Sequence, residues 1–431
     1  MAEIRRLIFD LTGSSVWPGP PTGIIKTERK LGMLAPQVTR LPVEYCVFDQ
    51  KAMSFFFLNP KVLGALFAGA LAIEYENPLS GTRSSFLRQP RKYLLSKIRS
   101  LEEVLGRALV PARQSKSGSS IPLREAVRSR AEFTNHDVVV SCGPDWNGKD
   151  MAEIWRQKRE IGFRYVSTCY DVIPWRHPHF WPEGFAERVV SHYGEMAWVA
   201  DLVMCISRKT AEEYEELCLA LDVPCPRLEV FRLGDTEADN VVAARLPSEL
   251  ESSKFVLMVA SIEPRKNHWL LYNVWEDLIR SNDIPTDVKL VFAGSSKWMT
   301  TDLLLQIKLN PILRDRIVIL HRVPQPQLNR LYRECLFTVY PSFHEGWGLP
   351  VAESLRHGKV CISSSRGSLP EISPLAVLLD PFDTYSWRDA MRKHIVDTSL
   401  RAAAEARIRH EFVPTTWEQT AQSFFDPIVA L

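Results

Sequence analysis

Two cations near the middle of the chain could bind a phosphorylated ligand. Arg265 and Lys266 come just after a predicted strand, residues 255–260, and stand at the start of a predicted helix, residues 268–280. Cations at a helix N-terminus are electrostatically unfavourable unless an anion lies beside them. A bound phosphate group would supply that anion. The alternative interpretation is a solvated pair of surface side chains.

A second segment, residues 341–353, follows another predicted strand and leads into a helix. Its loop contains Gly346 and Gly348, so backbone N–H groups and the positive end of the helix dipole can face an anion. Glu345 and Glu353 flank the loop, eight residues apart. Ionised carboxylates accept hydrogen bonds from the vicinal hydroxyl groups of a sugar or a ribose. The alternative is that Glu353 merely complements the helix N-terminus.

The elements that must position these residues alternate between short apolar strands and amphipathic helices. This pattern is typical of parallel sheets covered by helices on both faces. A polar linker, residues 236–253, separates two such series, so the sequence predicts two doubly wound α/β domains, roughly 1–240 and 250–410. Ligands bind at the carboxyl ends of the strands in such sheets, which makes the cleft between the domains the expected site. The predicted strands are residues 7–11, 43–48, 138–142, 165–169, 202–206, 255–260, 289–293, 317–320, 337–340, 360–363 and 376–379, and the predicted helices include residues 185–199, 210–220, 268–280 and 325–333.

Composition narrows the class of protein. The chain has 431 residues, of which 24% are charged and 45% hydrophobic, as in ordinary globular proteins. A net charge of +2 argues against a protein that binds nucleic acid over its whole surface. The eight cysteines include no CxxC pair, which predicts buried free thiols in a reducing cytoplasm rather than a zinc module or a disulfide scaffold. The first residues lack the features of a signal peptide. The longest apolar run, residues 62–73, is too short to span a membrane and predicts a buried helix.

Residues 83–120 depart from the average, with nine basic and two acidic side chains. Leucine and isoleucine recur there at helical spacing, so the segment predicts a basic amphipathic helix. One interpretation is a solvated helix packed on its own domain. The other is attachment to an anionic membrane surface or to a lipid-linked phosphate.

Together the motifs resemble a known family. They are Glu-Pro-Arg-Lys-Asn at 263–267, Pro-Ser-x-x-Glu-Gly-x-Gly-Leu-Pro-x-x-Glu at 341–353, and Gly-x-x-Pro-Glu-Ile at 367–372. This combination resembles family-4 glycosyltransferases, which are retaining nucleotide-sugar enzymes of the GT-B architecture. The resemblance covers nearly the whole chain and is strongest over residues 254–372. It implies two Rossmann-like domains, with an acceptor-binding domain at 1–240, a nucleotide-sugar domain at 250–410, and a helix within 411–431 that crosses back to the first domain.

The resemblance also implies roles for individual residues. Arg265 and Lys266 would bind the donor diphosphate and stabilise the departing nucleoside diphosphate. Glu345 would contact the donor sugar and, with those two cations, make up the catalytic set, while Glu353 would hold the ribose hydroxyls. The other implied donor-binding residues are Gly23, Ser261, Arg322, Val323, His344, Gly346, Trp347, Gly348 and Leu349. The candidates on the acceptor side are Trp146, Tyr170 and Asp171, with Trp146 as a stacking platform for a sugar.

Three further patterns bear on cofactors. The chain has no Asp-x-Asp motif, and an Arg/Lys pair with a helix N-terminus can stabilise a departing diphosphate, so neither a metal nor another cofactor is expected. Residues 143–150 have the spacing of a P-loop, but Asp150 replaces the required Ser or Thr, which argues against a nucleoside triphosphate site. His177 and His179 have no evident third ligand for a metal. Tyr170 stands where the family often has His, which leaves any acid–base role there open.

The sequence thus predicts a cytoplasmic, metal-independent, retaining hexosyltransferase. It would move a hexose from a nucleotide-diphosphate sugar such as GDP-mannose to a glycan or lipid-linked acceptor, in the synthesis of a surface polysaccharide such as lipopolysaccharide. Peripheral attachment to the inner face of a membrane through residues 83–120 is a further expectation, and no nucleic acid partner is expected. The alternatives are a sugar-nucleotide epimerase or a phosphorylase of the same fold, and a non-catalytic nucleotide-sugar-binding scaffold.

Overall fold

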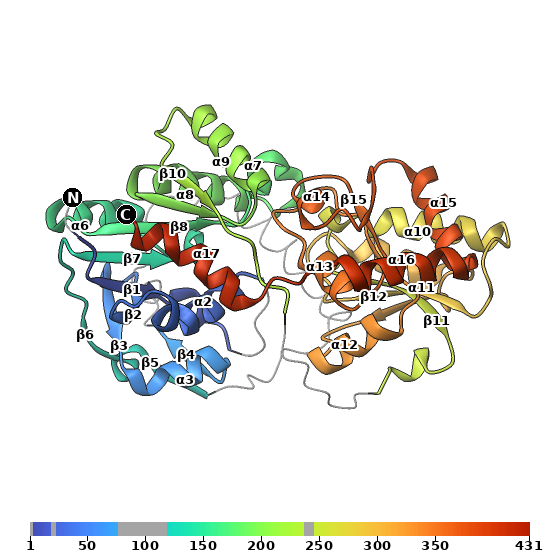
Figure 1. Cartoon of the computed structure of the whole chain (residues 1–431), viewed down its shortest axis with the longest axis horizontal. Helices are drawn as coiled ribbons and strands as arrows, with labels where there is room; N and C mark the ends of the chain where they lie inside the picture. Colours follow the sequence, from blue (N-terminus) through green and yellow to red (C-terminus); the bar gives the residue numbers. More distant parts are fainter. Residues whose placement is uncertain (1–2, 19–22, 76–118, 237–244) are drawn as a thin grey trace, which may run out of the picture.

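The structure, a computed structural model, describes residues 3–18, 23–75, 119–236 and 245–431. Two α/β domains lie side by side, and each has a sheet with helices packed on both faces (Figure 1). The loops that follow the strands of one sheet contact the loops that follow the strands of the other, as shown by Gly346 beside Tyr170. The predicted fold class, α/β with two doubly wound sheets, is confirmed.

The N-terminal sheet has the strand order β10-β9-β8-β7-β1-β2-β3-β6. Its strands are parallel except around β3, which runs antiparallel to both β2 and β6. A separate pair, β4 and β5, forms a small parallel sheet. The strands are β1 (Arg6–Asp10), β2 (Val43–Asp49), β3 (Ser54–Leu58), β4 (Leu71–Glu74), β5 (Ser119–Pro122), β6 (Val127–Arg130), β7 (Asp137–Ser141), β8 (Arg164–Cys169), β9 (Leu202–Cys205) and β10 (Arg227–Val230).

The C-terminal sheet is wholly parallel, with the order β13-β12-β11-β14-β15-β16. Its central strands are almost completely buried because helices cover both faces, which explains why they are continuous apolar runs such as FVLMV. The strands are β11 (Lys254–Val259), β12 (Val288–Ala293), β13 (Ile317–Leu320), β14 (Thr338–Tyr340), β15 (Cys361–Ser364) and β16 (Val377–Leu379).

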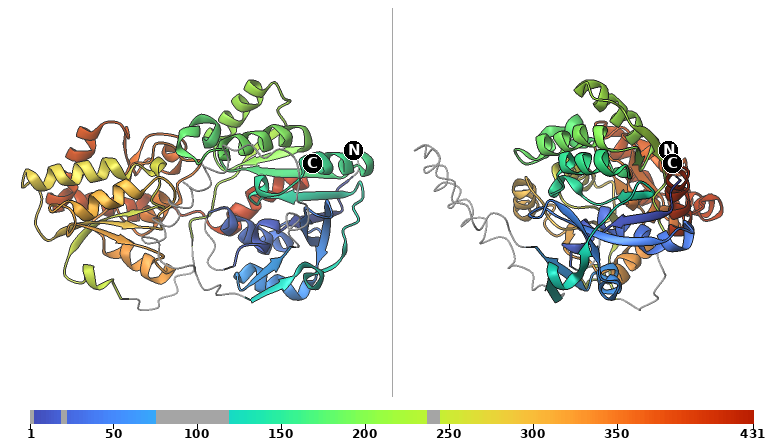
Figure 2. Two further views of the ribbon diagram at one scale, coloured as in Figure 1. Left: turned by 180° about the vertical axis from the view of Figure 1, so that it is seen from behind. Right: turned by 90° about the vertical axis from the view of Figure 1, so that its left-hand side faces the viewer.

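The helices alternate with the strands, and the last one returns to the first domain. Phe425 on α17 packs against Phe9, and Phe424 packs against Phe231, both in the N-terminal domain. Figure 2 shows α17 in red on this domain in both further views. The helices are α1 (Thr12–Ser15), α2 (Ile24–Val38), α3 (Pro60–Ala68), α5 (Leu123–Ala126), α6 (Met151–Ile161), α7 (Ile173–Arg176), α8 (Phe185–Val199), α9 (Arg208–Leu221), α10 (His268–Arg280), α11 (Thr301–Leu309), α12 (Gln325–Glu334), α13 (Leu349–Arg356), α14 (Leu369–Ile372), α15 (Thr384–Val396), α16 (Thr398–Glu411) and α17 (Trp417–Val429).

The apolar run 62–73 differs from its prediction as one buried helix. It contains most of α3, a turn at Gly69, and most of β4. Gly69 has a φ of 70°, a left-handed conformation that ends the helix and that glycine adopts without strain. Of the residues in α3, Leu66 alone is buried. Among the described residues, no helix is long and apolar enough to cross a membrane. The predicted basic helix lies outside the described residues except for its last two positions.

The cysteines are free thiols, as expected, and seven of the eight are buried. Cys225 is the exception and is exposed.

Candidate active site

A buried cluster of charged side chains lies at the carboxyl ends of β11 and β14. Arg265 and Lys266 belong to a single 3-10 turn, Pro264–Lys266, that precedes α10. Glu345 lies in the loop after β14. Its Oε1 is 2.5 Å from Nζ of Lys266, and its Oε2 is 2.7 Å from Nη1 of Arg265. The structure therefore brings the three predicted catalytic residues together.

Two hydroxyl groups and a second carboxylate complete the cluster. Ser342 and Tyr340 both donate to Oε1 of Glu345, at 2.6 and 3.1 Å. Nζ of Lys266 also donates to the hydroxyl of Tyr340 at 2.8 Å. On the other side, Nη2 of Arg265 lies 2.9 Å from Glu263. Each of these side chains is thus held by more than one neighbour.

The electrostatics of the cluster follow from its burial and its mutual contacts. Burial raises the pKa of Glu345, but Arg265 and Lys266 outweigh burial and bring that pKa down to about 2. Burial disfavours the charged form of Arg265 too, yet the carboxylates of Glu345 and Glu263 hold its pKa above the ordinary value. Burial, and then repulsion by Arg265, lower the pKa of Lys266, and Glu345 offsets them only in part. Two cations therefore face two carboxylates in a site of low dielectric constant, where charge interactions are strong.

The N-terminal domain closes directly on this cluster at Gly346. A Cβ atom at this position would lie 2.1 Å from the carbonyl oxygen of Tyr170 and 2.9 Å from Cβ of Asp171. Thr210 donates to the carbonyl oxygen of Gly346 at 3.4 Å. A side chain at residue 346 would force the two domains apart, so glycine is required by close approach.

Further contacts between the domains surround the cluster. Nε2 of His344 lies 3.1 Å from Oε2 of Glu213 on α9, and both side chains are buried. Glu371 accepts hydrogen bonds from the first two backbone N–H groups of α9 at 2.9 and 2.8 Å, which caps that helix from the other domain. Phe343 stacks on Phe180 with ring centroids 5.5 Å apart.

Ser368 fixes the loop that leads into α13 by hydrogen bonds, and the start of the helix has no side-chain cap. Ser368 donates to the carbonyl oxygens of Glu345 and Trp347, both at 3.0 Å. Gly348 is the N-cap residue of α13, with a φ of 119°, and no side chain bonds to the first turn. Leu349 is its first residue. Two buried donors of these segments, Nε of Arg265 and Nε1 of Trp347, have no hydrogen-bond partner among the described residues. Such a set of donors can bind the oxygens of a phosphate or a sugar.

Several predicted donor-binding residues lie outside the cluster. Glu353 is on α13 and accepts a hydrogen bond of 2.9 Å from the hydroxyl of Tyr332. Arg322 and Val323 follow β13 at the same edge of the sheet, where Arg322 is exposed and Val323 packs on the core. Ser261 donates to Glu263 at 3.0 Å.

Gly23 was expected to let its loop approach the donor phosphates. The structure gives a different reason for glycine there. It is the N-cap residue of α2 with a φ of 50°, a conformation that other residues rarely adopt. No described atom lies within 4 Å of an added Cβ.

The acceptor-side candidates divide into two groups. Tyr170 and Asp171 lie beside Gly346, as described above. Trp146 is half-buried and packs against the core, with its ring 6.4 Å from that of Tyr193, and it does not line the cavity beside its own loop. The role of Trp146 as a sugar-stacking platform stays a prediction, and the short 3-10 turn Asp145–Asn147 sets the direction of its ring.

Sequence reasoning missed other residues of the site. Glu263, Tyr340 and Ser342 lie within or beside the quoted motifs, so their spacing to Arg265 and Glu345 was a usable signal. Thr210 and Glu213 lie on a helix more than 120 residues away, and nothing in their local sequence marks them. The described residues contain no group of three or more His, Cys, Asp or Glu side chains that could hold a metal ion.

Comparisons with known proteins place the chain among glycosyltransferase relatives. Residues 245–411 match the family described as Glycosyl transferases group 1. The chain is 25% identical over 287 residues to the serotype-specific mannosyltransferase WbdA of Escherichia coli, an alignment that covers 63% of this chain and 34% of WbdA. It is 26% identical over 283 residues to the O-antigen chain mannosyltransferase B of Escherichia coli, covering 59% of this chain and 67% of that protein. This chain thus spans only about a third of the length of WbdA.

Solved structures show the same fold. The crystal structure of HepE from Anabaena in complex with UDP and glucose has a TM-score of 0.60 at 14% identity, covering 99% of this chain and 100% of HepE. The sucrose-phosphate synthase from Thermosynechococcus elongatus has a TM-score of 0.57 at 16% identity, covering all of both chains. The predicted GT-B architecture and the resemblance to family-4 glycosyltransferases are confirmed.

Proposed function

We propose that this chain, whose residues 245–411 form a glycosyltransferase group 1 domain, transfers a hexose from a nucleotide-diphosphate sugar to a glycan acceptor. The observation that carries the proposal is the buried cluster of Arg265, Lys266 and Glu345 at the carboxyl ends of β11 and β14. In this proposal the C-terminal domain binds the donor and the N-terminal domain binds the acceptor. The reaction takes place where Gly346 meets Tyr170.

Charge stabilisation is the main task of the protein in this reaction. The bond between the anomeric carbon and the β-phosphate oxygen breaks, and its electron pair stays on that oxygen. Arg265 and Lys266, supported by the uncapped start of α13, stabilise the growing negative charge, and these cations need no metal ion to do so. Because both side chains are held in place before the reaction, little reorganisation is needed at the transition state.

The acceptor hydroxyl forms the new bond to the anomeric carbon on the face that the phosphate leaves. Its proton passes to the departing phosphate oxygen, so the step balances without a carboxylate base and the anomeric configuration is retained. Glu345 accepts a hydrogen bond from a hydroxyl of the donor sugar, and Glu353 accepts from the ribose. Tyr170 takes no part in proton transfer, since burial raises its pKa well above 10.

The identities of donor and acceptor are finer parts of the proposal. The relatives are named as mannosyltransferases, which supports a GDP-mannose-like donor and an acceptor glycan, free or lipid-linked, in the synthesis of a surface polysaccharide. HepE was solved with UDP, so a UDP-sugar belongs in the same test. A cytoplasmic location, with peripheral attachment to a membrane through residues 83–120, completes the proposal.

A thermal-shift panel tests the donor site. GDP, UDP, dTDP and ADP, each with and without its sugar, are added to the wild type, to Lys266→Ala and to the control Lys254→Ala. Lys254 is a largely exposed lysine at the opposite end of β11. A nucleotide that binds the native state raises the melting temperature by mass action. We expect one nucleotide to stabilise the wild type and the control but not Lys266→Ala.

Two results would contradict the proposal. One is equal stabilisation of all three proteins, which would place the nucleotide elsewhere. The other is conversion of the donor sugar to an isomer without acceptor, which would make the protein an epimerase.

A further inference from the structure

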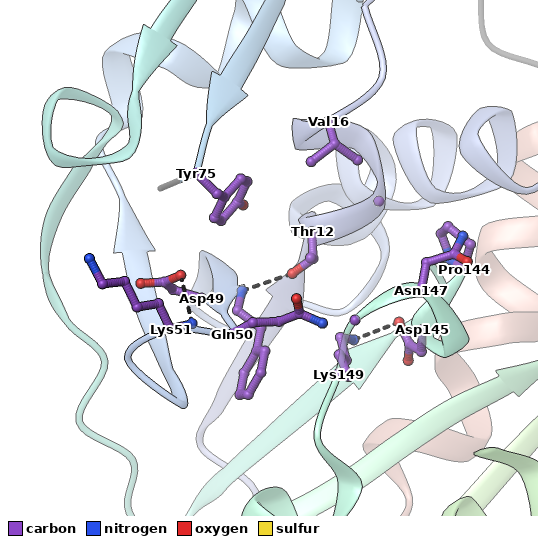
Figure 3. Close-up of a pocket in the computed structure, with 13 residues that line it drawn as sticks. Thr12, Val16, Asp49, Gln50, Lys51, Tyr75, Pro144, Asp145, Asn147 and Lys149 are labelled. Atoms are coloured by element: carbon purple, nitrogen blue, oxygen red, sulfur yellow. Dashed lines mark hydrogen bonds and ion pairs between the residues drawn. The ribbon is translucent and has the colours of Figure 1, made fainter. Parts of the chain in front are cut away.

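A cavity of about 310 Å³ opens in the N-terminal domain, away from the charged cluster of the C-terminal domain. It lies at the carboxyl ends of β1, β2 and β7, with Tyr75 after β4 on the remaining side (Figure 3). Its volume falls in the range of about 300–1,000 Å³ that small-molecule sites occupy. Its wall includes Pro144, Asp145, Asn147, Gly148 and Lys149, which belong to the loop whose sequence has the spacing of a P-loop.

The lysine that would bind phosphate in a P-loop is already bonded to side chains of the protein. The ammonium of Lys149 lies between Asp10 and Asp145, 2.7 Å from the latter, and also contacts Ser141. Its side chain is only 1% exposed. Burial disfavours its charge, but the two carboxylates outweigh burial and raise its pKa well above 10.5. Lys149 therefore forms the floor of the cavity and is not a free cation for a ligand.

The charges around the cavity do not favour an anion. Asp145 and Lys149 line the floor, Asp10 lies beside the ammonium of Lys149, and at the rim Asp49 and Lys51 carry opposite charges. Behind the floor, burial raises the pKa of Glu28 to about 8, so this carboxyl is mostly neutral at pH 7. A phosphate, sulfate or carboxylate would meet no surplus of positive charge here, and its desolvation would not be repaid.

The walls suit a neutral molecule that carries hydroxyl groups. Phe48, Tyr75, Val16 and Pro144 provide apolar and aromatic surface. Two exposed amide side chains, Gln50 and Asn147, also line the cavity, and Figure 3 shows Gln50 extending across its lower part. No hydrogen bond is formed by either amide within the described part of the chain. An amide offers both donors and an acceptor, which matches the hydroxyl groups of a sugar, while aromatic rings match the C–H faces.

Close packing fixes the position of Gln50. A Cβ atom at residue 148 would lie 2.5 Å from Nε2 of Gln50, so the absence of a side chain at Gly148 lets this amide lie against the loop.

The cavity is also connected to the candidate active site. The hydroxyl of Tyr170 donates to the carbonyl oxygen of Cys142 at 2.7 Å, two residues before Pro144 of the cavity wall. The carbonyl oxygen of the same tyrosine lies against Gly346 in the loop of Glu345. A single buried residue therefore contacts both the strand end that supports the cavity and the loop that would hold the donor sugar.

We propose that this cavity is a subsite for a neutral sugar unit of the acceptor glycan, bound through the amides of Gln50 and Asn147 and the rings of Phe48 and Tyr75. The proposal rests on the proposed glycosyltransferase function, because that function supplies the acceptor. It excludes the nucleoside triphosphate that the spacing of residues 143–150 would otherwise suggest.

Ligand-observed NMR with methyl α-D-mannopyranoside as the neutral probe tests the subsite, and mannose 6-phosphate serves as the charged counterpart. The proteins are the wild type, Gln50→Ala, Asn147→Ala and the control Gln306→Ala, which changes an exposed glutamine on α11. We expect the neutral probe to bind the wild type and the control alike and at least 5-fold more weakly to the two amide variants. The phosphorylated probe should bind the wild type at least 5-fold more weakly than the neutral one. Because both amides are exposed, the melting temperatures should agree among the four proteins.

Repeating the experiment with saturating nucleoside diphosphate separates this subsite from the donor site. Persistence of the mannoside signal supports the subsite, whereas displacement by nucleotide, binding to the amide variants as strong as to the wild type, or no mannoside binding overturns it. Lys266→Ala provides the other separation. If the nucleotide stabilises Lys266→Ala as well as the wild type, the proposed donor site is contradicted. If mannoside binding still depends on Gln50 and Asn147 in that case, the sugar subsite is supported independently.

Discussion

Two buried lysines occupy similar places in the two domains but differ in what surrounds them. Lys266 and Lys149 both follow parallel strands and both pair with carboxylates. Lys149 has two carboxylates, Asp10 and Asp145, and among the described groups that act most strongly on it none is a cation. Lys266 shares one carboxylate, Glu345, with Arg265. Accordingly, the pKa of Lys149 is raised and that of Lys266 is lowered.

This difference separates a cation that supports the fold from one that can serve a ligand. Adding a phosphate beside Lys149 would place a third negative charge near one ammonium. Adding a phosphate beside Lys266 and Arg265 relieves the repulsion between two cations. We infer that a lysine with a lowered pKa beside an arginine is the better indicator of a phosphate site here. The P-loop spacing around Lys149 points to the wrong lysine.

The largest expected effect is on turnover in Lys266→Met. Methionine preserves the length of the side chain but cannot stabilise a departing diphosphate. Loss of one preorganised electrostatic contact lowers the rate by about 10²–10³-fold, so kcat/KM for the donor should fall by that amount. The measurement is the initial rate of nucleoside diphosphate release with a mannose-terminated oligosaccharide as acceptor.

The matched control for this measurement is Lys254→Met, at the exposed amino end of β11. It should keep at least half of the wild-type rate. A Lys266→Met enzyme within 5-fold of the wild type would refute the assignment of Lys266 to the leaving group.

The second prediction concerns stability, where the substitution of Lys149 should have a larger effect than that of Lys266. Lys149→Met leaves Asp10 and Asp145 buried without their cation, and breaking a buried pair in this way costs about 3–5 kcal/mol. Lys266→Met should cost less, because Arg265 still pairs with Glu345 at 2.7 Å. Urea denaturation of both variants measures the free energies of unfolding. Equal losses of unfolding free energy in the two variants would mean that Lys149 is no more important for stability than Lys266.

A third effect sharpens the description of the Lys149 cluster through its pH dependence. Burial raises the pKa of Glu28 from 4.5 to about 8, despite hydrogen bonds from Ser14. The folded protein then holds a proton that the unfolded chain releases near pH 4.5. Stability therefore falls as pH rises from about 4.5 to 8, by about 5 kcal/mol. Glu28→Gln should remove this slope and be more stable than the wild type at pH 8.

Urea denaturation between pH 5 and pH 8 checks this expectation, with Glu132→Gln as a control on an exposed glutamate. If the wild type and Glu28→Gln show the same slope against pH, Glu28 is ionised in the folded state.

The sequence predicted the fold better at its centre than at its edges. All eleven strands that it predicts are present, because buried parallel strands such as FVLMV in β11 are continuous apolar runs. It missed β3, β4, β5, β6 and β10. Of these, β6 and β10 are short strands at the two edges of the N-terminal sheet with mostly exposed residues. Such strands bury too little surface to leave an apolar pattern.

The candidate site divides in the same way. Arg265, Lys266 and Glu345 could be found because each lies within a short segment between a strand and a helix, and the topology brings those segments to one edge. Glu213 could not, because its contact with His344 depends on how the two domains pack. The direction of the Trp146 ring was also beyond the sequence, since a 3-10 turn of three residues determines it.

The smallest expected effect concerns Tyr170, the residue that links the two regions. Removing its hydroxyl in Tyr170→Phe deletes the hydrogen bond to Cys142, at a cost of about 0.5–1.5 kcal/mol in stability. Since burial keeps its pKa well above 10, the phenol does not exchange a proton near neutral pH. The shape of the kcat profile between pH 6 and 9 should therefore match that of the wild type, while KM for the acceptor rises a few-fold as the cavity wall loosens. A shifted apparent pKa in that profile would give Tyr170 the proton-transfer role that a histidine could fill there, whereas an unshifted profile with a raised KM leaves it as a positioning residue between the sugar cavity and the charged cluster.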